Sequence, residues 1–208
     1  MASRRQFIQS GLALSAASLP AVSALAAQAA PGGASQTLRL ERFVVDVRLP
    51  QAVELARHAA IRGIPVAETS GDLTEIWRGD FAPRWKQAPM ALAGATTRGE
   101  LFVLETLAND HGMRVVYRGR HDGSKRARAR HRLSGPAEVL AGATARAHGF
   151  SRGFSWSALA GALAACPVGL TPTARLELET EAVAPGPAGD EPLYTWIIAP
   201  RAALTARA

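Results

Sequence analysis

Cysteine is almost absent from this 208-residue sequence, since Cys166 is the only one. A single cysteine cannot form a disulfide bond within the chain, and without a Cys-x-x-Cys or Cys-x-x-Cys-His motif it gives no support for a zinc site or covalently bound haem. The five histidines show neither His-Glu-x-x-His nor His-x-His spacing, so no metal site is expected. We expect Cys166 to be a small buried apolar residue at a helix end, and no pattern identifies a cofactor.

Long apolar runs are also missing beyond residue 30, so no stable membrane span is expected, because a span needs about 20 strongly apolar residues. Apolar residues make up 48% and charged residues 20% of the chain, which is typical of a globular protein. Residues 31–208 are enough for one domain with a sizeable core.

Residues 1–30 have the pattern of a cleavable signal peptide. Two arginines, Arg4 and Arg5, precede the uncharged and mildly apolar stretch from Phe7 to Leu25, which Pro20 interrupts. Small residues at positions 24, 26, 27 and 29 follow, so we expect cleavage near Ala26 or Ala29. Without the two arginines, the formal net charge falls from +7 to +5.

The segment SRRQFIQ, residues 3–9, resembles the twin-arginine export signal S-R-R-x-F-L-K and departs from it only at Ile8 and Gln9. The residues that carry this export signal are Arg4, Arg5 and Phe7. The resemblance, confined to residues 1–30, implies export of a folded protein to the periplasm by the twin-arginine translocase. It also implies a route often taken by cofactor-bearing proteins and by proteins that fold beside them. The alternative is a general secretion signal that carries two arginines.

Patterns in the first half of residues 38–208 alternate between strand and helix, after a flexible linker at 31–37. The periodicity predicts strands at 38–49, 64–68, 89–93 and 113–118, and helices at 51–62, 72–77 and 99–111. Thr97 and Glu100 fit a capping box at the start of the last helix, and Gly112 fits its end. Such alternation favours a mainly parallel sheet with helices on its faces.

The second half has a different character. We expect Ala-rich helices at 136–148 and 156–166, a half-exposed strand at 174–181 and a buried strand at 193–198. The two strands are predicted to form a C-terminal β-hairpin at the edge of the sheet. The predicted fold is therefore a single three-layer α/β domain over residues 38–208, with a mainly parallel sheet and a C-terminal β-hairpin.

Residues 118–132 hold six arginines, one lysine and one aspartate, and we expect them to form a solvated basic loop. Such a run would suit nucleic acid, but export to the periplasm argues against that ligand. The functional alternative is docking onto an acidic protein partner or an anionic membrane surface. Residues 78–88 are predicted to form a loop that continues from Trp77 and combines aromatic residues with arginines, a composition common at binding surfaces. The alternative is that Trp77, Trp85 or both close the core. The candidate partner-docking residues are Trp77, Arg84, Trp85, Arg126, Arg128 and Arg130.

The loop Gly94–Gly99 has the G-x-x-x-x-G spacing of a phosphate-binding loop, but Glu100 and Leu101 follow where Lys and Ser or Thr are needed. It fits either a plain strand-turn-helix junction or a small-anion site. Because ligands of parallel sheets bind beyond the carboxyl ends of the strands, several polar residues are expected near one crevice. These candidate ligand-binding residues are Ser70, Asp72, Thr96, Thr97, Arg98, Arg120 and His121.

The segment Gly149–Gly153 matches the G-x-S-x-G motif of serine hydrolases but lacks its context. The residues before it are predicted to be helical, and no histidine follows Ser151. No complete catalytic constellation is present, so the favoured hypothesis is a periplasmic accessory or binding protein, associated with an exported redox enzyme. The alternatives are a small anionic-ligand binder and an enzyme that uses Asp72 or His121 beyond the strand ends.

Overall fold

The computed structural model of the chain describes residues 38–122, 128–144, 155–166, 173–181 and 191–201. The strands are β1 (Leu40–Asp46), β2 (Val66–Thr69), β3 (Ala91–Thr96), β4 (Met113–Asp122), β5 (Arg128–Pro136), β6 (Thr173–Glu181) and β7 (Leu193–Pro200). The helices are α1 (Pro50–Ile61), α2 (Thr74–Ile76), the π-helical turn η1 (Trp77–Phe81), α3 (Ala82–Gln87), α4 (Arg98–Asp110), α5 (Ala137–Ala143) and α6 (Trp156–Ala164). The predicted signal peptide, the linker and the segment Gly149–Gly153 lie outside the described residues.

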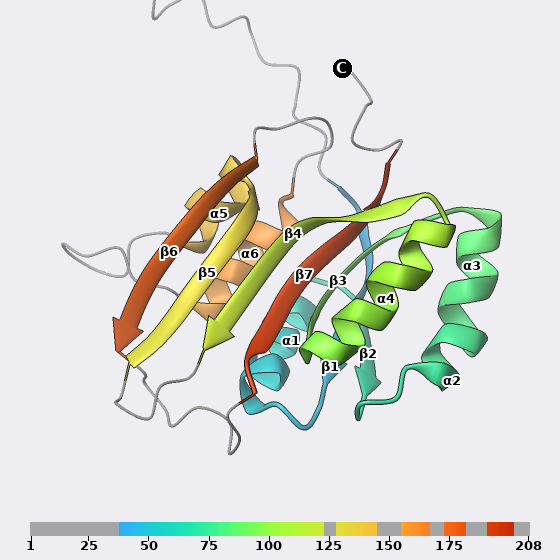
Figure 1. Cartoon of the computed structure of the whole chain (residues 1–208), viewed down its shortest axis with the longest axis horizontal. Helices are drawn as coiled ribbons and strands as arrows, with labels where there is room; N and C mark the ends of the chain where they lie inside the picture. The colour runs from blue at the N-terminus through green and yellow to red at the C-terminus, as the bar shows by residue number, and fades with distance from the viewer. Residues whose placement is uncertain (1–37, 123–127, 145–154, 167–172, 182–190, 202–208) are drawn as a thin grey trace, which may run out of the picture. The chain divides into compact units, whose positions relative to one another are not determined.

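The strands form one mixed sheet in the order β2-β1-β3-β7-β4-β5-β6, as Figure 1 shows. Only β2, β1 and β3 are parallel to one another. Each of the remaining neighbours pairs in the antiparallel sense. The predicted α/β class is therefore confirmed, but the prediction of a mainly parallel sheet is wrong.

The predicted C-terminal hairpin is also wrong, because β6 and β7 are not neighbours. The strand β7 lies between β3 and β4 in the middle of the sheet, whereas β6 pairs with β5 at the edge. Every residue of β7 from Leu193 to Ala199 is buried, which suits a central strand. The exposed Arg175 and Glu177 of β6 suit an edge strand, where charged side chains discourage pairing with other chains.

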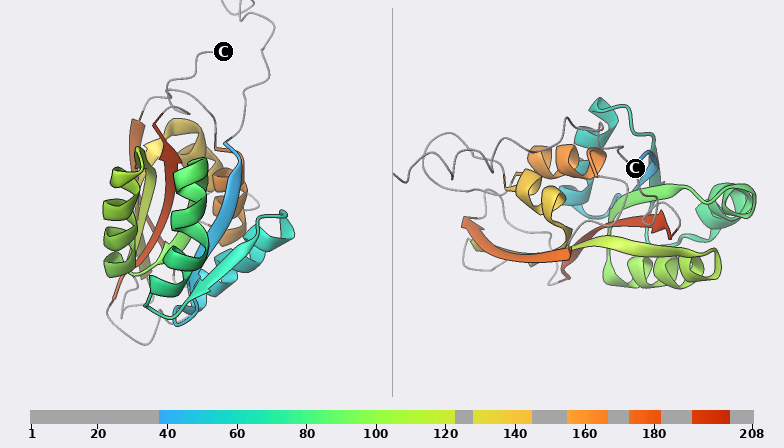
Figure 2. Two further views of the ribbon diagram at one scale, coloured as in Figure 1. Left: turned by 90° about the vertical axis from the view of Figure 1, so that its right-hand side faces the viewer. Right: turned by 90° about the horizontal axis from the view of Figure 1, so that it is seen from above.

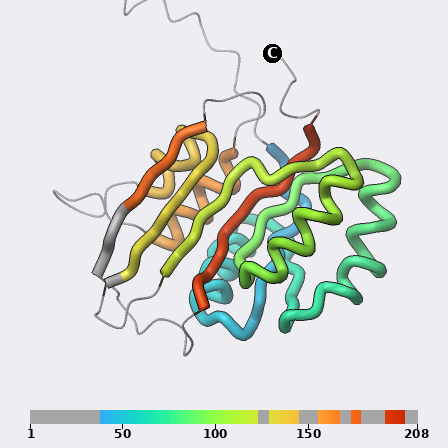
Figure 3. The backbone as a smooth tube through the Cα atoms, in the orientation of Figure 1, coloured from blue at the N-terminus to red at the C-terminus, as the bar shows by residue number. Residues whose placement is uncertain are grey.

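Helices cover both faces of the sheet but not over its whole width. One core, with Leu55, Leu133 and Leu159 among its members, lies between the sheet and α1, α5 and α6. The other core includes Leu104 and Trp196 and lies beneath η1, α3 and α4. Figure 2 shows these two helical layers on opposite faces, and the tube in Figure 3 shows β4, β5 and β6 with no described helix in front of them.

Local signals account for the helix ends. Pro50 occupies the first turn of α1, and Gly63 follows its end with a φ of 76°, a conformation that glycine adopts readily. The predicted capping box of α4 is confirmed, since the Thr97 side chain accepts from the Glu100 amide and the Glu100 side chain accepts from the Thr97 amide.

Among the described residues, no helix is long and apolar enough to cross a membrane.

Two predicted loops are regular structure instead. Residues 78–88 are largely helical, within η1 and α3, because Phe81 and Trp85 turn into the core beneath α4. Of the basic run 118–132, the described residues belong to the end of β4 and to β5, which pair with each other from Arg118–Ser134 to Asp122–Arg130. In β5, Arg130 and Arg132 alternate with the buried His131 and Leu133, so the charges lie on one face and the buried residues on the other.

Candidate functional site

The parallel strands β1 and β3 end side by side at a topological switch point. The chain leaves β1 through α1 on one face to reach β2, and returns from β2 through η1 and α3 on the other face to reach β3. Open α/β sheets bind ligands outside the carboxyl ends of their strands at such a point. Three predicted residues, Ser70, Asp72 and Thr97, lie at this end of β2 and β3.

A buried carboxyl pair occupies the switch point beneath an arginine. Asp46 ends β1 and is fully buried, and Glu100 in the first turn of α4 is 4% exposed. Arg48 Nε donates to Asp46 Oδ1 at 2.9 Å and Arg48 Nη2 donates to Asp46 Oδ2 at 2.6 Å, a bidentate pair. Arg48 Nη2 is also 3.8 Å from Glu100 Oε2. A Cβ at Gly71 would lie 2.7 Å from the Arg48 guanidinium, so only glycine leaves room for it.

The pKa values of the two carboxyl groups are shifted in opposite directions. Burial raises the pKa of Glu100, and the hydrogen bond and charge of Asp46 raise it further. Burial also acts to raise the pKa of Asp46, but the hydrogen bonds from Arg48 outweigh burial and hold that pKa below its ordinary value. Glu100 Oε1 accepts from Thr69 Oγ1 at 3.0 Å, and Glu100 Oε2 accepts from Thr97 Oγ1 at 3.0 Å. These hydrogen bonds join β1, β2 and α4. We call the residues that make them the clamp: Asp46, Arg48, Thr69, Thr97 and Glu100.

Other predicted ligand residues surround the clamp without forming one site. Ser70 and Asp72 are exposed, and Asp72 Oδ1 accepts from the Thr74 amide at 2.8 Å, which lowers its pKa. Thr96 is fully buried and accepts from Trp196 Nε1 at 3.0 Å. Arg98 is exposed in the first turn of α4. The prediction of a loop at Gly94–Gly99 is wrong, because Gly94 to Thr96 belong to β3, Arg98 and Gly99 belong to α4, and Thr97 caps the helix.

Arg120 and His121 lie at the carboxyl end of β4, which shares its edge of the sheet with the ends of β1 and β3. However, β7 separates β4 from β3, with Tyr194 in register with both Thr96 and Arg120. The two side chains also point to opposite faces. Arg120 pairs with Asp122 on the face of α4, and His121 packs against Trp156 of α6. The structure therefore does not bring His121 and the exposed Asp72 together as an acid–base pair.

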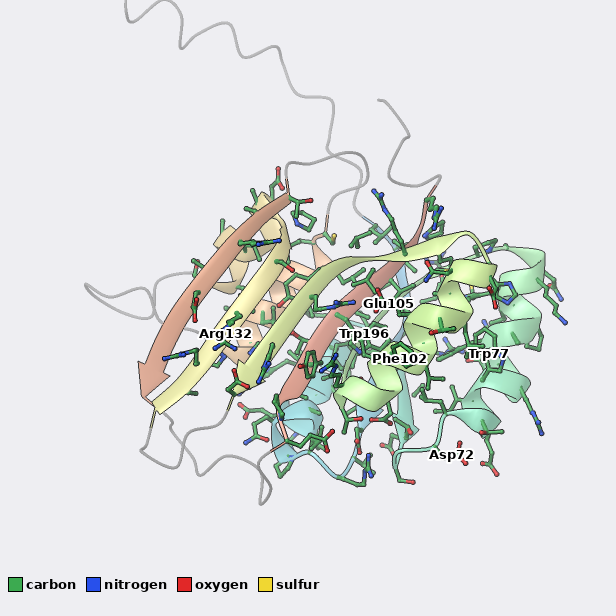
Figure 4. The ribbon with its side chains drawn as sticks, in the orientation of Figure 1. Asp72, Trp77, Phe102, Glu105, Arg132 and Trp196 are labelled. Atoms are coloured by element: carbon green, nitrogen blue, oxygen red, sulfur yellow. The ribbon has the colours of Figure 1, made fainter. Side chains whose placement is uncertain are left out.

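A second charged region covers the face of β4, β5 and β6 that no described helix covers, which we call the open face. Asp122 pairs with both Arg120 at 2.8 Å and Arg132 at 2.9 Å. Glu177 of β6 pairs with Arg132 at 3.1 Å and lies 3.8 Å from Arg130. Carboxylates and guanidinium groups thus alternate across three strands, and we call this chain of pairs the arginine ladder. Arg132 is labelled on it in Figure 4.

The edge of the open face is formed by α4. Arg118 Nη2 donates to Glu105 Oε2 at 2.6 Å, which ties β4 to this helix. Phe102 lies three residues before Glu105 and therefore on the same side of α4, and its side chain is 68% exposed. Figure 4 labels Phe102 and Glu105 on α4 beside the open face. An exposed aromatic residue therefore lies beside several arginines, and both residue types are enriched at interfaces.

The structure places the predicted partner-docking residues in different surroundings. Trp85 is 2% exposed and packs edge-on against the partly buried Trp77, with ring centroids 5.6 Å apart, so Trp85 belongs to the core and not to a docking surface. Arg84 pairs with Asp80 of η1. Arg126 lies outside the described residues, as does the side chain of Arg128. Arg130 lies in the arginine ladder.

Sequence reasoning missed Asp46, Arg48, Thr69 and Phe102. The signal for Asp46 was a charged residue at the carboxyl end of the apolar run Phe43–Val45. Among the described residues, no three side chains of histidine, cysteine, aspartate or glutamate are placed to hold a metal ion. Comparison with family models, curated proteins and solved structures gave no match. The function therefore has to be argued from the chemistry of these surfaces.

Proposed function

We propose that this is an exported binding protein that holds an extended acidic segment of a partner protein across the open face. The observation that carries the proposal is the open face, where arginines outnumber carboxylates among the described side chains beside an exposed phenylalanine. The described charged side chains there are Arg118, Arg120, Arg130, Arg132 and Arg175, against Glu105, Asp122 and Glu177.

The ladder leaves donors for a partner. A guanidinium group has five N–H donors, and the ladder contacts of Arg120 and Arg132 use only some of them. The side chains of these two arginines are 43% and 41% exposed. Additional carboxylates can therefore join the ladder without displacing Asp122 or Glu177, and Phe102 offers an apolar contact to a neighbouring side chain of the same segment.

Clamp and ladder differ in what they leave for a ligand. At the clamp, both carboxylate groups lie beneath Arg48 and bind partners within the protein. At the open face, the charged groups lie in a row across three strands, and Arg120, Arg132 and Glu177 are well exposed. A row across a sheet face suits an extended protein segment better than a small molecule, which binds in a concave site.

The binding test uses a labelled synthetic peptide with alternating glutamates around one central phenylalanine. Arg120→Gln and Phe102→Ala should each weaken binding about tenfold, because aromatic and arginine residues dominate interface energies. Two matched controls lie on α1: Arg57→Gln removes an exposed arginine, and Ile61→Ala removes an apolar residue that is 74% exposed. Equal losses in all four variants would mean non-specific attraction to a basic protein and would refute the proposed face.

Two further probes separate the acidic segment from other anionic partners. A peptide with the central phenylalanine replaced by serine should bind less tightly to the native protein and equally to Phe102→Ala. Vesicles of anionic lipid should not compete with the peptide. Full competition by the vesicles would assign the open face to a membrane surface instead.

The proposed location rests on the twin-arginine resemblance of residues 3–9. Replacing Arg4 and Arg5 together by lysine should leave the full-length precursor in the cytoplasm, because this route requires the arginine pair. The measurement is the mass of the protein in cytoplasmic and periplasmic fractions. Continued export of the variant would indicate the general secretion route. A partner in the same compartment, such as an exported redox enzyme, would meet the folded protein there.

A further inference from the structure

A buried hydrogen-bonded chain runs beneath the open face and ends in two histidines. Tyr117 Oη lies 3.2 Å from Thr195 Oγ1, which lies 2.8 Å from His121 Nε2. His121 Nδ1 lies 2.8 Å from His131 Nδ1. The chain crosses β7, β4 and β5, the strands that connect the centre of the sheet to its antiparallel half.

The two histidines are closely enclosed. His121 is 5% and His131 is 3% exposed, and the ring of Trp156 from α6 lies 5.0 Å from the His121 ring. Gly119 lies above the chain, and a Cβ there would come within 2.7 Å of Tyr117 Oη and 2.9 Å of His121 Nε2. Because no side chain fits at Gly119, the backbone of β4 packs directly against the polar chain.

The histidine pair and the arginine ladder use the same stretch of β4 and β5 from opposite faces. His121 lies between Arg120 and Asp122 in sequence, and it pairs directly across the strands with His131. His131 in turn lies between Arg130 and Arg132. A movement of β4 relative to β5 that separates the two imidazoles therefore also disturbs the register that aligns the ladder.

This arrangement cannot hold both histidines charged, and burial disfavours the first charge as well. The hydrogen bond between the two Nδ1 atoms needs one donor and one acceptor, and two imidazolium rings at this distance would repel each other. Burial lowers the pKa of His121, and the charge of His131 lowers it further. Burial lowers the pKa of His131 to about 4, against an opposing effect of Asp122. Burial also raises the pKa of Tyr117 far above neutrality, so its phenol stays uncharged.

We propose that the His121–His131 pair makes the open face pH-sensitive, so that acid opens β4, β5 and the α6 cover and releases the acidic segment. The proposal rests on the docking function argued above. Its structural part, the acid opening, can be measured without a partner.

The expected change of the opening equilibrium with pH follows from proton linkage. The opened state binds more protons than the closed state between the ordinary histidine pKa of 6.5 and the buried value of about 4. Stability of the closed state is therefore lost as the pH falls from 6.5 towards 4. For His131 alone, opening should be about 30-fold more favourable at pH 5 than at pH 7.5.

Amide hydrogen exchange of the full protein, corrected for the intrinsic effect of pH, tests the opening. Protection of β4 and β5 should fall about 30-fold or more between pH 7.5 and pH 5, while β1 and β3 change little. His131→Asn should make this fall about 30-fold smaller, because its amide can hydrogen bond to His121 without titrating, while the buried His121 still titrates. His58→Asn, on α1, is the matched control and should leave it unchanged.

The acidic peptide then tests the consequence. Native protein should lose peptide binding between pH 7.5 and pH 5, and His131→Asn should lose less of it over the same range. If exchange responds to pH as expected but the peptide binds at neither pH, the docking function fails and the acid opening stands. An equal fall in protection of β1 and β3, or a His131→Asn variant with the native pH dependence, would overturn the inference itself. If His131→Asn does not fold, a nuclear magnetic resonance titration of the native imidazoles decides, and a pKa above 6 for both would overturn it.

Discussion

In the half of the sheet made by β2, β1 and β3, helices pack on both faces, whereas in the half made by β4, β5 and β6 described helices pack along one face and α4 covers only the start of β4 on the other. The first half buries the carboxylate of its ion pair: Asp46 is fully enclosed and accepts from the half-exposed Arg48. The second half spreads its ion pairs over an exposed surface, where Asp122 and Glu177 each contact two arginines.

The difference separates charges that hold the fold from charges that are available to a partner. A buried carboxylate that loses its arginine keeps its desolvation cost and loses the compensating interaction, so the fold depends on it. The charges of an exposed ion pair stay in contact with water whether or not they are paired, so the pair contributes little to stability. Charges in the second half can therefore be rearranged by a ligand at small cost, which charges in the first half cannot.

The largest effect is expected at the junction of the two halves, where Gly94 of β3 faces Trp196 of β7. A Cβ at position 94 would overlap the Trp196 ring and lie 2.7 Å from the Val44 carbonyl oxygen. Gly94→Ala should therefore cost about 3 kcal/mol or prevent folding, because well-packed cores do not absorb added atoms. Urea unfolding monitored by circular dichroism measures the loss.

Gly99→Ala is the control for this substitution, because an added Cβ would meet nothing closer than Thr97 Oγ1 at 3.9 Å. Alanine favours a helix over glycine by up to about 1 kcal/mol, so this variant should be as stable as the native protein or slightly more so. Equal destabilisation by both substitutions would show that the junction of the two halves is not tightly packed.

A smaller but still large effect is expected at the clamp. Asp46→Asn should cost about 2 to 3 kcal/mol, because Arg48 loses its bidentate carboxylate. Glu100→Gln should cost much less, since Glu100 takes up a proton more readily than an ordinary glutamate. Urea unfolding at pH 7 compares the two variants. Equal losses would contradict the assigned difference between the two carboxyl groups.

The pH dependence of the clamp has opposite signs at its two carboxyl groups. The lowered pKa of Asp46 stabilises the fold above the unfolded pKa of 3.8, and that contribution is lost as the pH falls. The raised pKa of Glu100 stabilises the fold at low pH, and that contribution is lost as the pH rises above its unfolded value of 4.5. Glu100→Gln should therefore gain stability relative to the native protein as the pH rises.

The parallel half was predictable from the sequence because its signals are local. Pro50 marks the start of α1, and Thr97 with Glu100 marks the start of α4 within four residues. The clamp was harder to predict. Asp46, Arg48 and Glu100 are brought together by the pairing of β1 with β3 and by the turn into α4, and neither contact has a sequence motif.

The antiparallel half was not predictable in the same way because its pairings are distant. The alternation of β5 was visible, but its arginines suggested a solvated loop. The register places Arg132 opposite Glu177, which is 45 residues away, and that partner turns a charged segment into a strand. The central place of β7 likewise depends on β3 and β4, about 100 and 75 residues earlier in the chain.

An intermediate effect is expected at the cap that links the clamp to α4. Thr97→Ala removes the side chain that accepts from the Glu100 amide and donates to the Glu100 carboxylate, and should cost about 1 to 2 kcal/mol. Thr106→Ala is the control, because its exposed hydroxyl only donates to the Phe102 carbonyl within the same helix. Thermal unfolding should place the control within about 0.5 kcal/mol of the native protein. A cost for Thr106→Ala equal to that of Thr97→Ala would argue against the cap.

The smallest effect is expected in the arginine ladder. Glu177→Gln should cost less than about 1 kcal/mol, and high salt should reduce the cost further, because its contacts with Arg130 and Arg132 are exposed to water. Urea unfolding in low and high salt measures both. A loss as large as that of Asp46→Asn would mean that the ladder holds β6 on the sheet, so that its charges serve the fold and are not available to a partner. A small loss, together with tighter peptide binding once the competing carboxylate is gone, would separate the charges that hold this protein together from those it presents to other molecules.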